Sequence, residues 1–148
     1  MSTTTTTRVP HPVRAAAMAV AVVFLLVGVL GFVPGITAHL DRISFAGPGS
    51  GAHLLGVFHV SVLHNLVHLL FGAAGLLLAR TVSSARSFLI GGGAVYLVLW
   101  LYGLLVDKGS AANFAPFNTA DDWLHLGLGV GMIALALGLK GNPNARSA

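Results

Sequence analysis

The side chains able to bind ligands or transfer protons gather in two short stretches of the sequence. The first stretch contains His53, His59, His64, Asn65 and His68, and the second contains Asn118, Asp121, Asp122 and His125. Imidazole and carboxylate groups supply metal ligands, haem ligands and acid–base pairs. What these stretches can do therefore depends on the elements that carry them and on whether the fold brings them together.

The first stretch has the spacing of one polar face on a helix. At about 100° per residue, His64, Asn65 and His68 share an arc of about 120°. The same arc also collects His53, Ser61, Gly72 and Gly75, whereas His59 lies away from it. Because polar groups at membrane depth need partners, we expect this face to point toward other helices. Hydrogen bonding between helices is the favoured interpretation, with ligand binding or proton transfer as the alternatives.

The second stretch has the signature of a helix start. Thr119 and Asp122 have the three-residue spacing of an N-cap and its capping-box partner. Acidic side chains in a first turn also stabilise the positive end of the helix dipole. Asp121 and His125 lie four residues apart on one face, so the carboxylate is placed to orient the imidazole or to hold it charged.

The composition excludes a soluble fold. Of 148 residues, 55% are hydrophobic and 8% are charged, whereas soluble chains carry about 25% charged residues. The absence of cysteine excludes disulfide scaffolds, iron–sulfur clusters and thiol chemistry. The basic residues form no patch or run, so we expect no nucleic-acid partner. The partner that the composition does predict is the lipid bilayer.

Four apolar segments are long enough to cross a bilayer as helices. They span residues 15–33, 54–78, 88–106 and 123–139, against a requirement of about 17–25 residues. The first is longer than a signal-peptide core of about 7–15 residues and no clean cleavage site follows it, so we expect it to be retained. The predicted fold is an all-α, integral membrane four-helix bundle that forms a single domain over residues 15–140.

The charged residues between these segments predict the orientation. Most basic residues fall in the N-terminal tail, the second loop and the C-terminal tail, namely Arg8, Arg14, Arg80, Arg86, Lys140 and Arg146. The first and third loops hold Arg42, Lys108 and the acidic residues. The positive-inside rule therefore predicts a plasma-membrane protein with both termini cytoplasmic. We also expect a disordered tail at residues 1–14, a second tail at 141–148, and a short interfacial helix at 37–45.

Two further expectations concern how the segments pack. Asp121 and His125 should lie near the membrane surface, close to His53 or His59, because a charged pair is least costly there. His64, Asn65 and His68 should form a deeper layer that packs against the first and third apolar segments. A G-x-x-x-G pattern at residues 127–131 predicts a seam where two helices approach closely.

At these residues the chain resembles an actinobacterial family of small four-helix membrane proteins known as domain of unknown function 4383. The resemblance covers nearly the whole chain. It rests on GVLGFVPGIT at residues 28–37, LGVFHVSVLHNLVHLLFG at 55–72 and FNTADDWLHLGLG at 117–129. The resemblance implies four membrane helices and no particular activity. Relatives tend to carry an acidic or asparagine residue where this chain has His59 and Ser61, so it implies no shared role at those two positions.

Three functional hypotheses remain open. The first is a non-enzymatic protein whose His/Asn/Asp network holds the bundle together, as an accessory partner of a membrane assembly or as a homo-oligomer. The second is a haem- or divalent-metal-binding protein that uses His64 and His68, with His125 as a further candidate ligand. The third is a proton-linked carrier or membrane enzyme that uses Asp121 and His125. No catalytic residue is assigned, because the chain has no Glu, no Cys nucleophile and no G-x-S-x-G.

Overall fold

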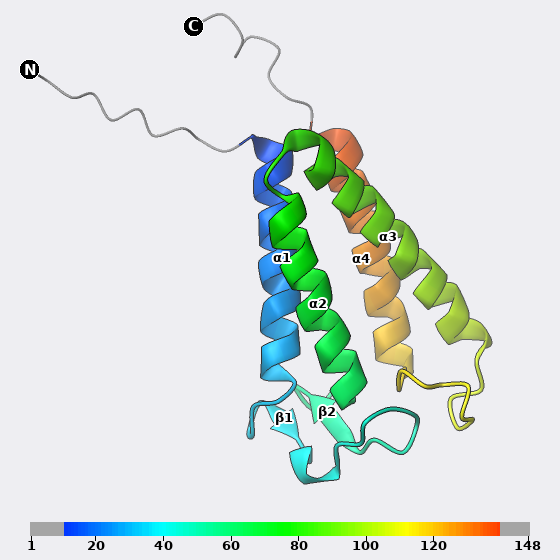
Figure 1. Cartoon of the computed structure of the whole chain (residues 1–148). Helices are drawn as coiled ribbons and strands as arrows, with labels where there is room; N and C mark the ends of the chain where they lie inside the picture. Colours follow the sequence, from blue (N-terminus) through cyan, green and yellow to red (C-terminus); the bar gives the residue numbers. More distant parts are fainter. Residues whose placement is uncertain (1–10, 140–148) are drawn as a thin grey trace, which may run out of the picture.

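The molecule is a bundle of four helices with a small sheet at one end (Figure 1). The structure is a computed structural model that describes residues 11–139. The helices are α1 (Pro12–Leu30), α2 (Val62–Leu78), α3 (Val82–Leu105) and α4 (Thr119–Gly138). Helices α1, α3 and α4 are long and apolar enough to cross a membrane, and α2 is apolar but shorter. The predicted all-α membrane bundle is therefore confirmed.

The bundle has two distinct ends. Helix α1 begins and α4 ends at the same end, which we call the terminal end (Figure 1). The opposite end, which we call the loop end, consists of residues 31–61 and 106–118. The predicted tail at 141–148 and residues 1–10 of the N-terminal tail lie outside the described residues. Helix α1 starts at Pro12, a few residues before the predicted boundary, because proline suits the first turn of a helix.

The second apolar segment is not one helix. Helix α2 begins at Val62 instead of Leu54, and the Ser61 side chain caps it by accepting a hydrogen bond from the His64 backbone N–H at 3.1 Å. The preceding residues turn back at Gly56, whose φ of 71° is in the left-handed region that glycine tolerates. With 17 residues, α2 is about 26 Å long, slightly short of the ~30 Å hydrocarbon layer.

A three-stranded antiparallel sheet lies at the loop end, and its first strand begins where an interfacial helix over residues 37–45 is predicted. Its strands are β1 (Thr37–Ala38), β2 (Ala52–Leu54) and β3 (Phe58–Val60), in the order β1-β2-β3. Only residues 40–42 of the predicted helix form a short 3-10 turn. The β2–β3 hairpin pairs His53 with His59. It is anchored by buried Ala52, Leu54 and Val60, which pack against Val27 and Leu30 of α1.

The helices associate as two pairs. Helices α1 and α2 pack closely along their lengths, as do α3 and α4, while contacts between the pairs are fewer. The α3–α4 seam is at Gly93 and Gly129, where a Cβ on Gly129 would lie 3.0 Å from the Gly93 carbonyl oxygen. The seam predicted at residues 127–131 is wrong, since a Cβ on Gly127 or Gly131 would meet nothing within 4 Å. That pattern marks the outer side of α4.

Aromatic rings join the two helix pairs near the middle of the bundle. Phe24 of α1 stacks on Tyr96 of α3 with ring centroids 5.3 Å apart, and it packs edge-on against Phe71 of α2 at 5.0 Å. At the terminal end, Arg14 donates from Nε to the Ala79 carbonyl oxygen at 3.0 Å. The core is therefore apolar in the middle and toward the terminal end, and the polar side chains gather closer to the loop end.

Candidate functional site

Asn118 begins α4 and forms a capping box with Asp121. The Asn118 Oδ1 atom accepts from the Asp121 backbone N–H at 3.0 Å, and Asp121 Oδ2 accepts from the Asn118 backbone N–H at 2.9 Å. The cap predicted from the sequence lies one residue later, on Thr119 and Asp122, and is wrong. Asparagine is the better cap because its carbonyl oxygen reaches the third helical N–H without a branched β-carbon.

The same two residues tie α4 to the β-hairpin. Asp121 Oδ2 also accepts from the His59 backbone N–H at 3.3 Å. Asn118 Nδ2 donates to the Val57 carbonyl oxygen at 2.7 Å. The expected proximity of Asp121 to His59 is therefore present, although it involves the backbone of His59 and not its imidazole. These contacts give Asp121 a structural role at the loop end.

Asp122 points to the opposite side of α4 and pairs with Lys108. The Lys108 ammonium group lies 2.7 Å from Asp122 Oδ2 and donates to the Gly103 carbonyl oxygen at 2.6 Å. Asp122 is buried and Lys108 is half-buried. The only role predicted for Lys108 from the sequence concerns membrane topology. The sequence feature that could have identified this pairing is the position of Lys108, the single basic residue between the third apolar segment and the acidic pair Asp121 and Asp122.

His53 and His59 form a cross-strand pair outside the helices. Their ring centroids are 4.2 Å apart, and His53 Nδ1 lies 3.0 Å from the Gly51 carbonyl oxygen. Burial lowers the pKa of the His59 imidazole below its ordinary value, and the neighbouring His53 lowers it further. His53 is therefore not on the polar face of α2, because the strand that carries it precedes the helix.

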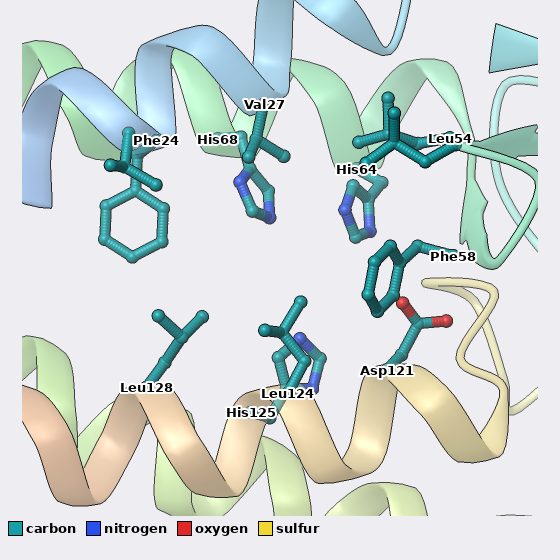
Figure 2. Close-up of a pocket in the computed structure, with 12 residues that line it drawn as sticks. Phe24, Val27, Leu54, Phe58, His64, His68, Asp121, Leu124, His125 and Leu128 are labelled. Carbon is teal, nitrogen blue, oxygen red and sulfur yellow. The ribbon is translucent and has the colours of Figure 1, made fainter. Parts of the chain in front are cut away.

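The inner imidazoles belong to His64 and His68 of α2 and His125 of α4. His64 and His68 stack with ring centroids 4.5 Å apart and an interplanar angle of 15°. Figure 2 shows both rings directed from α2 toward Asp121 and His125 on α4. His125 packs edge-on against Phe117 at 4.7 Å and lies 5.3 Å from Tyr96. The polar face predicted for α2 is buried in the bundle.

These side chains line a cavity between the two helix pairs. It has a volume of about 220 Å³, and its walls are mostly apolar. Its lining residues are Val23, Phe24, Val27, Leu54, Leu55, Phe58, His64, His68, Asp121, Leu124, His125 and Leu128. The predicted separation into a surface pair and a deeper layer is wrong, because α2 and α4 face each other across one open space. A second cavity of about 210 Å³ lies on the other side of the same three histidines.

The polar atoms of the inner residues have few protein partners. Within residues 11–139, no hydrogen-bond partner is found for His68 Nδ1, His125 Nδ1 or either polar atom of the Asn65 amide. His68 and His125 are 8% and 3% exposed. The predicted pairing of Asp121 with His125 is not formed, since Asp121 accepts from backbone groups instead. Asn65 is directed at Gly31 near the end of α1 and does not line either cavity.

The arrangement does not suit a metal ion or haem. Over the described part of the chain, no group of three or more His, Cys, Asp or Glu side chains is placed to hold a metal. The cavity of about 220 Å³ is smaller than the roughly 300–1,000 Å³ of pockets that enclose drug-sized ligands, and a haem needs more room than that cavity gives. The residues present therefore fit a small uncharged ligand better than either group.

The fold and the site together define a small helical membrane protein with a mostly apolar cavity, lined in part by histidines, between two helix pairs. The chain belongs to the family described as domain of unknown function 4383, whose model matches residues 14–138. The family resemblance found in the sequence is therefore confirmed. Comparison with curated proteins and with solved structures gave no match.

Proposed function

We propose that this protein binds a small, largely apolar molecule with a hydrogen-bonding head group in the cavity between its helix pairs. A mostly apolar pocket with a few convergent polar groups is the usual form of a small-molecule site. The cavity combines apolar walls with His64, His68 and His125. Binding, with no chemical step, accounts for all of these features.

The observation that carries this proposal is the contrast between the outer and inner polar residues. Asn118, Asp121 and Asp122 are all satisfied by protein partners at the loop end, and we assign them the structural role expected from the sequence. His68 Nδ1 and His125 Nδ1 have no such partner within the described residues. A buried unsatisfied polar group costs about 1–3 kcal/mol, so a ligand that satisfies these atoms would gain that energy.

Binding of 1-naphthol to the full chain in lipid nanodiscs tests this function. Naphthalene is the matched probe because it has the same rings without the hydroxyl group. We expect saturable binding of 1-naphthol above its partitioning into empty nanodiscs, and about tenfold weaker binding in His68→Leu and His125→Leu. His53→Leu is the matched control, since His53 lies outside both cavities. Equal binding of naphthol and naphthalene, or equal affinity in all variants, would contradict the proposal.

We further propose that the loop end faces the cell exterior in the plasma membrane. The basic residues of the terminal end, such as Arg14 and Arg86, support this orientation. The chain lacks cysteine, so single cysteines can be introduced on a clean background at exposed Ser83 and Ala111. A membrane-impermeant maleimide should label Ala111→Cys in intact cells and Ser83→Cys only after the membrane is opened. The reverse pattern would overturn the orientation.

A further inference from the structure

The cavity has an opening on the side of the bundle. Among its helical lining residues, Val23 of α1 is 50% exposed and Leu124 of α4 is 41% exposed, and Leu55 in the turn of the β-hairpin is 66% exposed. The other α1 and α4 residues of the lining, including Phe24 and His125, are buried or half-buried. The opening therefore lies between α1 and α4, which belong to different helix pairs and make few contacts with each other.

This opening is at membrane depth. Val23 lies seven residues before the end of α1, about 10 Å along the helix axis, and Leu124 lies five residues after the start of α4, about 8 Å along it. Both positions fall within a hydrocarbon layer of about 30 Å. Leu54 and Phe58 of the β-hairpin line the loop end of the cavity (Figure 2). A ligand dissolved in the lipid can therefore reach the cavity through the opening between α1 and α4.

The polar groups of the cavity lie on two facing walls. His64 and His68 extend from α2, while His125 extends from α4 (Figure 2). A neutral imidazole carries one donor and one acceptor nitrogen and exchanges between two tautomers. Each wall can therefore donate to a carbonyl oxygen or accept from a hydroxyl group. A ligand that satisfies both walls has oxygen atoms on two opposite edges.

The apolar walls favour a flat ring with a tail. The rings of Phe24 and Phe58 line the cavity, and aromatic side chains stack well on flat conjugated rings. The volume of about 220 Å³ is below the roughly 300–1,000 Å³ that encloses a whole drug-sized ligand. The cavity thus has room for a head group, while a longer tail must leave through the opening beside Val23.

We propose, on the basis of the binding function above, that the ligand is a lipid-dissolved quinone or quinol. Its ring would lie between the imidazoles of α2 and His125 of α4, and its tail would pass between α1 and α4 into the bilayer. The same site accommodates both forms, because the histidine tautomers donate to a quinone and accept from a quinol. The proposal concerns binding alone and includes no electron transfer.

The head-group requirement is tested with three probes that share a decyl tail. Decylubiquinone carries two ring carbonyl groups, 4-decylphenol carries one hydroxyl group, and decylbenzene carries no oxygen. Binding of all three probes to the full chain in nanodiscs can be measured by isothermal titration calorimetry, with empty nanodiscs as the reference. We expect decylubiquinone to bind about tenfold more tightly than 4-decylphenol, and His125→Leu to remove that difference. Equal dissociation constants for decylubiquinone and 4-decylphenol would overturn the quinone assignment.

The entry route is tested at two neighbouring residues of α1. Val23 borders the opening, whereas Val22 is 45% exposed and lines neither cavity. Val23→Phe should slow decylubiquinone association by about tenfold, and Val22→Phe should leave the rate unchanged. Neither variant alters a histidine, so both remain informative if His125→Leu fails to fold.

The outcomes separate this inference from the proposed function. If 1-naphthol binds in a histidine-dependent way but Val23→Phe associates as fast as Val22→Phe, entry between α1 and α4 is wrong while the binding function stands. If 1-naphthol binding depends on the histidines but decylubiquinone binds no more tightly than 4-decylphenol, the assignment of the ligand as a quinone is wrong while the binding function stands. If no probe binds saturably to the wild-type chain, both proposals fail.

Discussion

Asp121 and His59, which are 62 positions apart in the sequence, are joined by a hydrogen bond from the His59 backbone N–H to the Asp121 carboxylate at 3.3 Å. The same carboxylate closes the capping box of α4. One side chain therefore starts a helix and holds the β-hairpin that lines the loop end of the cavity. The position of the hairpin relative to α4 therefore depends on this residue together with Asn118, which donates to the Val57 carbonyl oxygen.

Removing that carboxylate should loosen the loop end. We expect Asp121→Ala to lower the free energy of unfolding by about 1–3 kcal/mol, because it removes the capping-box partner of Asn118 and the acceptor of the His59 backbone N–H. Unfolding in mixed detergent micelles by sodium dodecyl sulfate measures this change. Asp41→Ala is the control, since Asp41 is exposed and should change stability by less than about 0.5 kcal/mol. Equal stability of the two variants would show that the contact contributes nothing.

The ion pair of Lys108 with Asp122 should have an asymmetric mutational response. Lys108→Met leaves the Asp122 carboxylate buried without its charged partner, which should cost about 1–3 kcal/mol. Adding Asp122→Asn should recover most of that loss, because the buried charge is then gone. The double-mutant cycle of unfolding free energies measures the recovery. Additive effects of the two substitutions would contradict a direct pairing.

The interior face of α2 could be predicted because helix geometry alone determines it. The arc shared by His64, Asn65 and His68 depends only on their spacing within the helix. It is therefore the same whether the helix begins at Leu54, as predicted, or at Val62. The four-helix bundle likewise follows from the lengths of the apolar segments, which are independent of side-chain detail. Periodicity and length are local properties, and the sequence displays them directly.

The start of α2 could not be predicted from hydropathy. The residues from Leu54 to Val60 form an apolar run with one histidine, and such a run is compatible with a strand or a helix. The turn at Gly56 was the available signal, but one glycine is common in membrane helices. The meeting of His125 with His64 depends on how α4 packs across the bundle, and no spacing within either helix encodes that.

The paired histidines of the β-hairpin should make its stability depend on pH. Burial and His53 lower the pKa of His59 below its ordinary value, so the folded chain holds that proton less tightly than the unfolded chain does. The contribution of His59 to stability is therefore complete above pH ~6.5 and falls as the pH drops from there toward its lowered pKa.

The imidazole resonances of His59 in nuclear magnetic resonance spectra measure this shift directly. We expect a titration midpoint below the ordinary value in the wild-type chain, and a higher midpoint in His53→Gln because the neighbouring charge is removed. His39→Asn is the control, since His39 does not contribute to the shift of His59. A midpoint that does not move in His53→Gln would refute the interaction between the two rings.

Gly127 and Gly129, which lie two residues apart on nearly opposite faces of α4, should respond in opposite directions to the same substitution. A Cβ on Gly129 would lie 2.7 Å from the Leu97 Cδ2 atom and 3.0 Å from the Gly93 carbonyl oxygen of α3. Gly129→Ala should therefore force the helices apart and cost about 1–3 kcal/mol. A Cβ on Gly127 would meet nothing within 4 Å, so Gly127→Ala should raise stability by up to about 1 kcal/mol through helix propensity. Unfolding in detergent measures the free energy of unfolding of both variants. A loss of stability in Gly127→Ala would contradict this prediction. It would mean that the outer face of α4 is packed in the membrane, as it would be against a second copy of the chain.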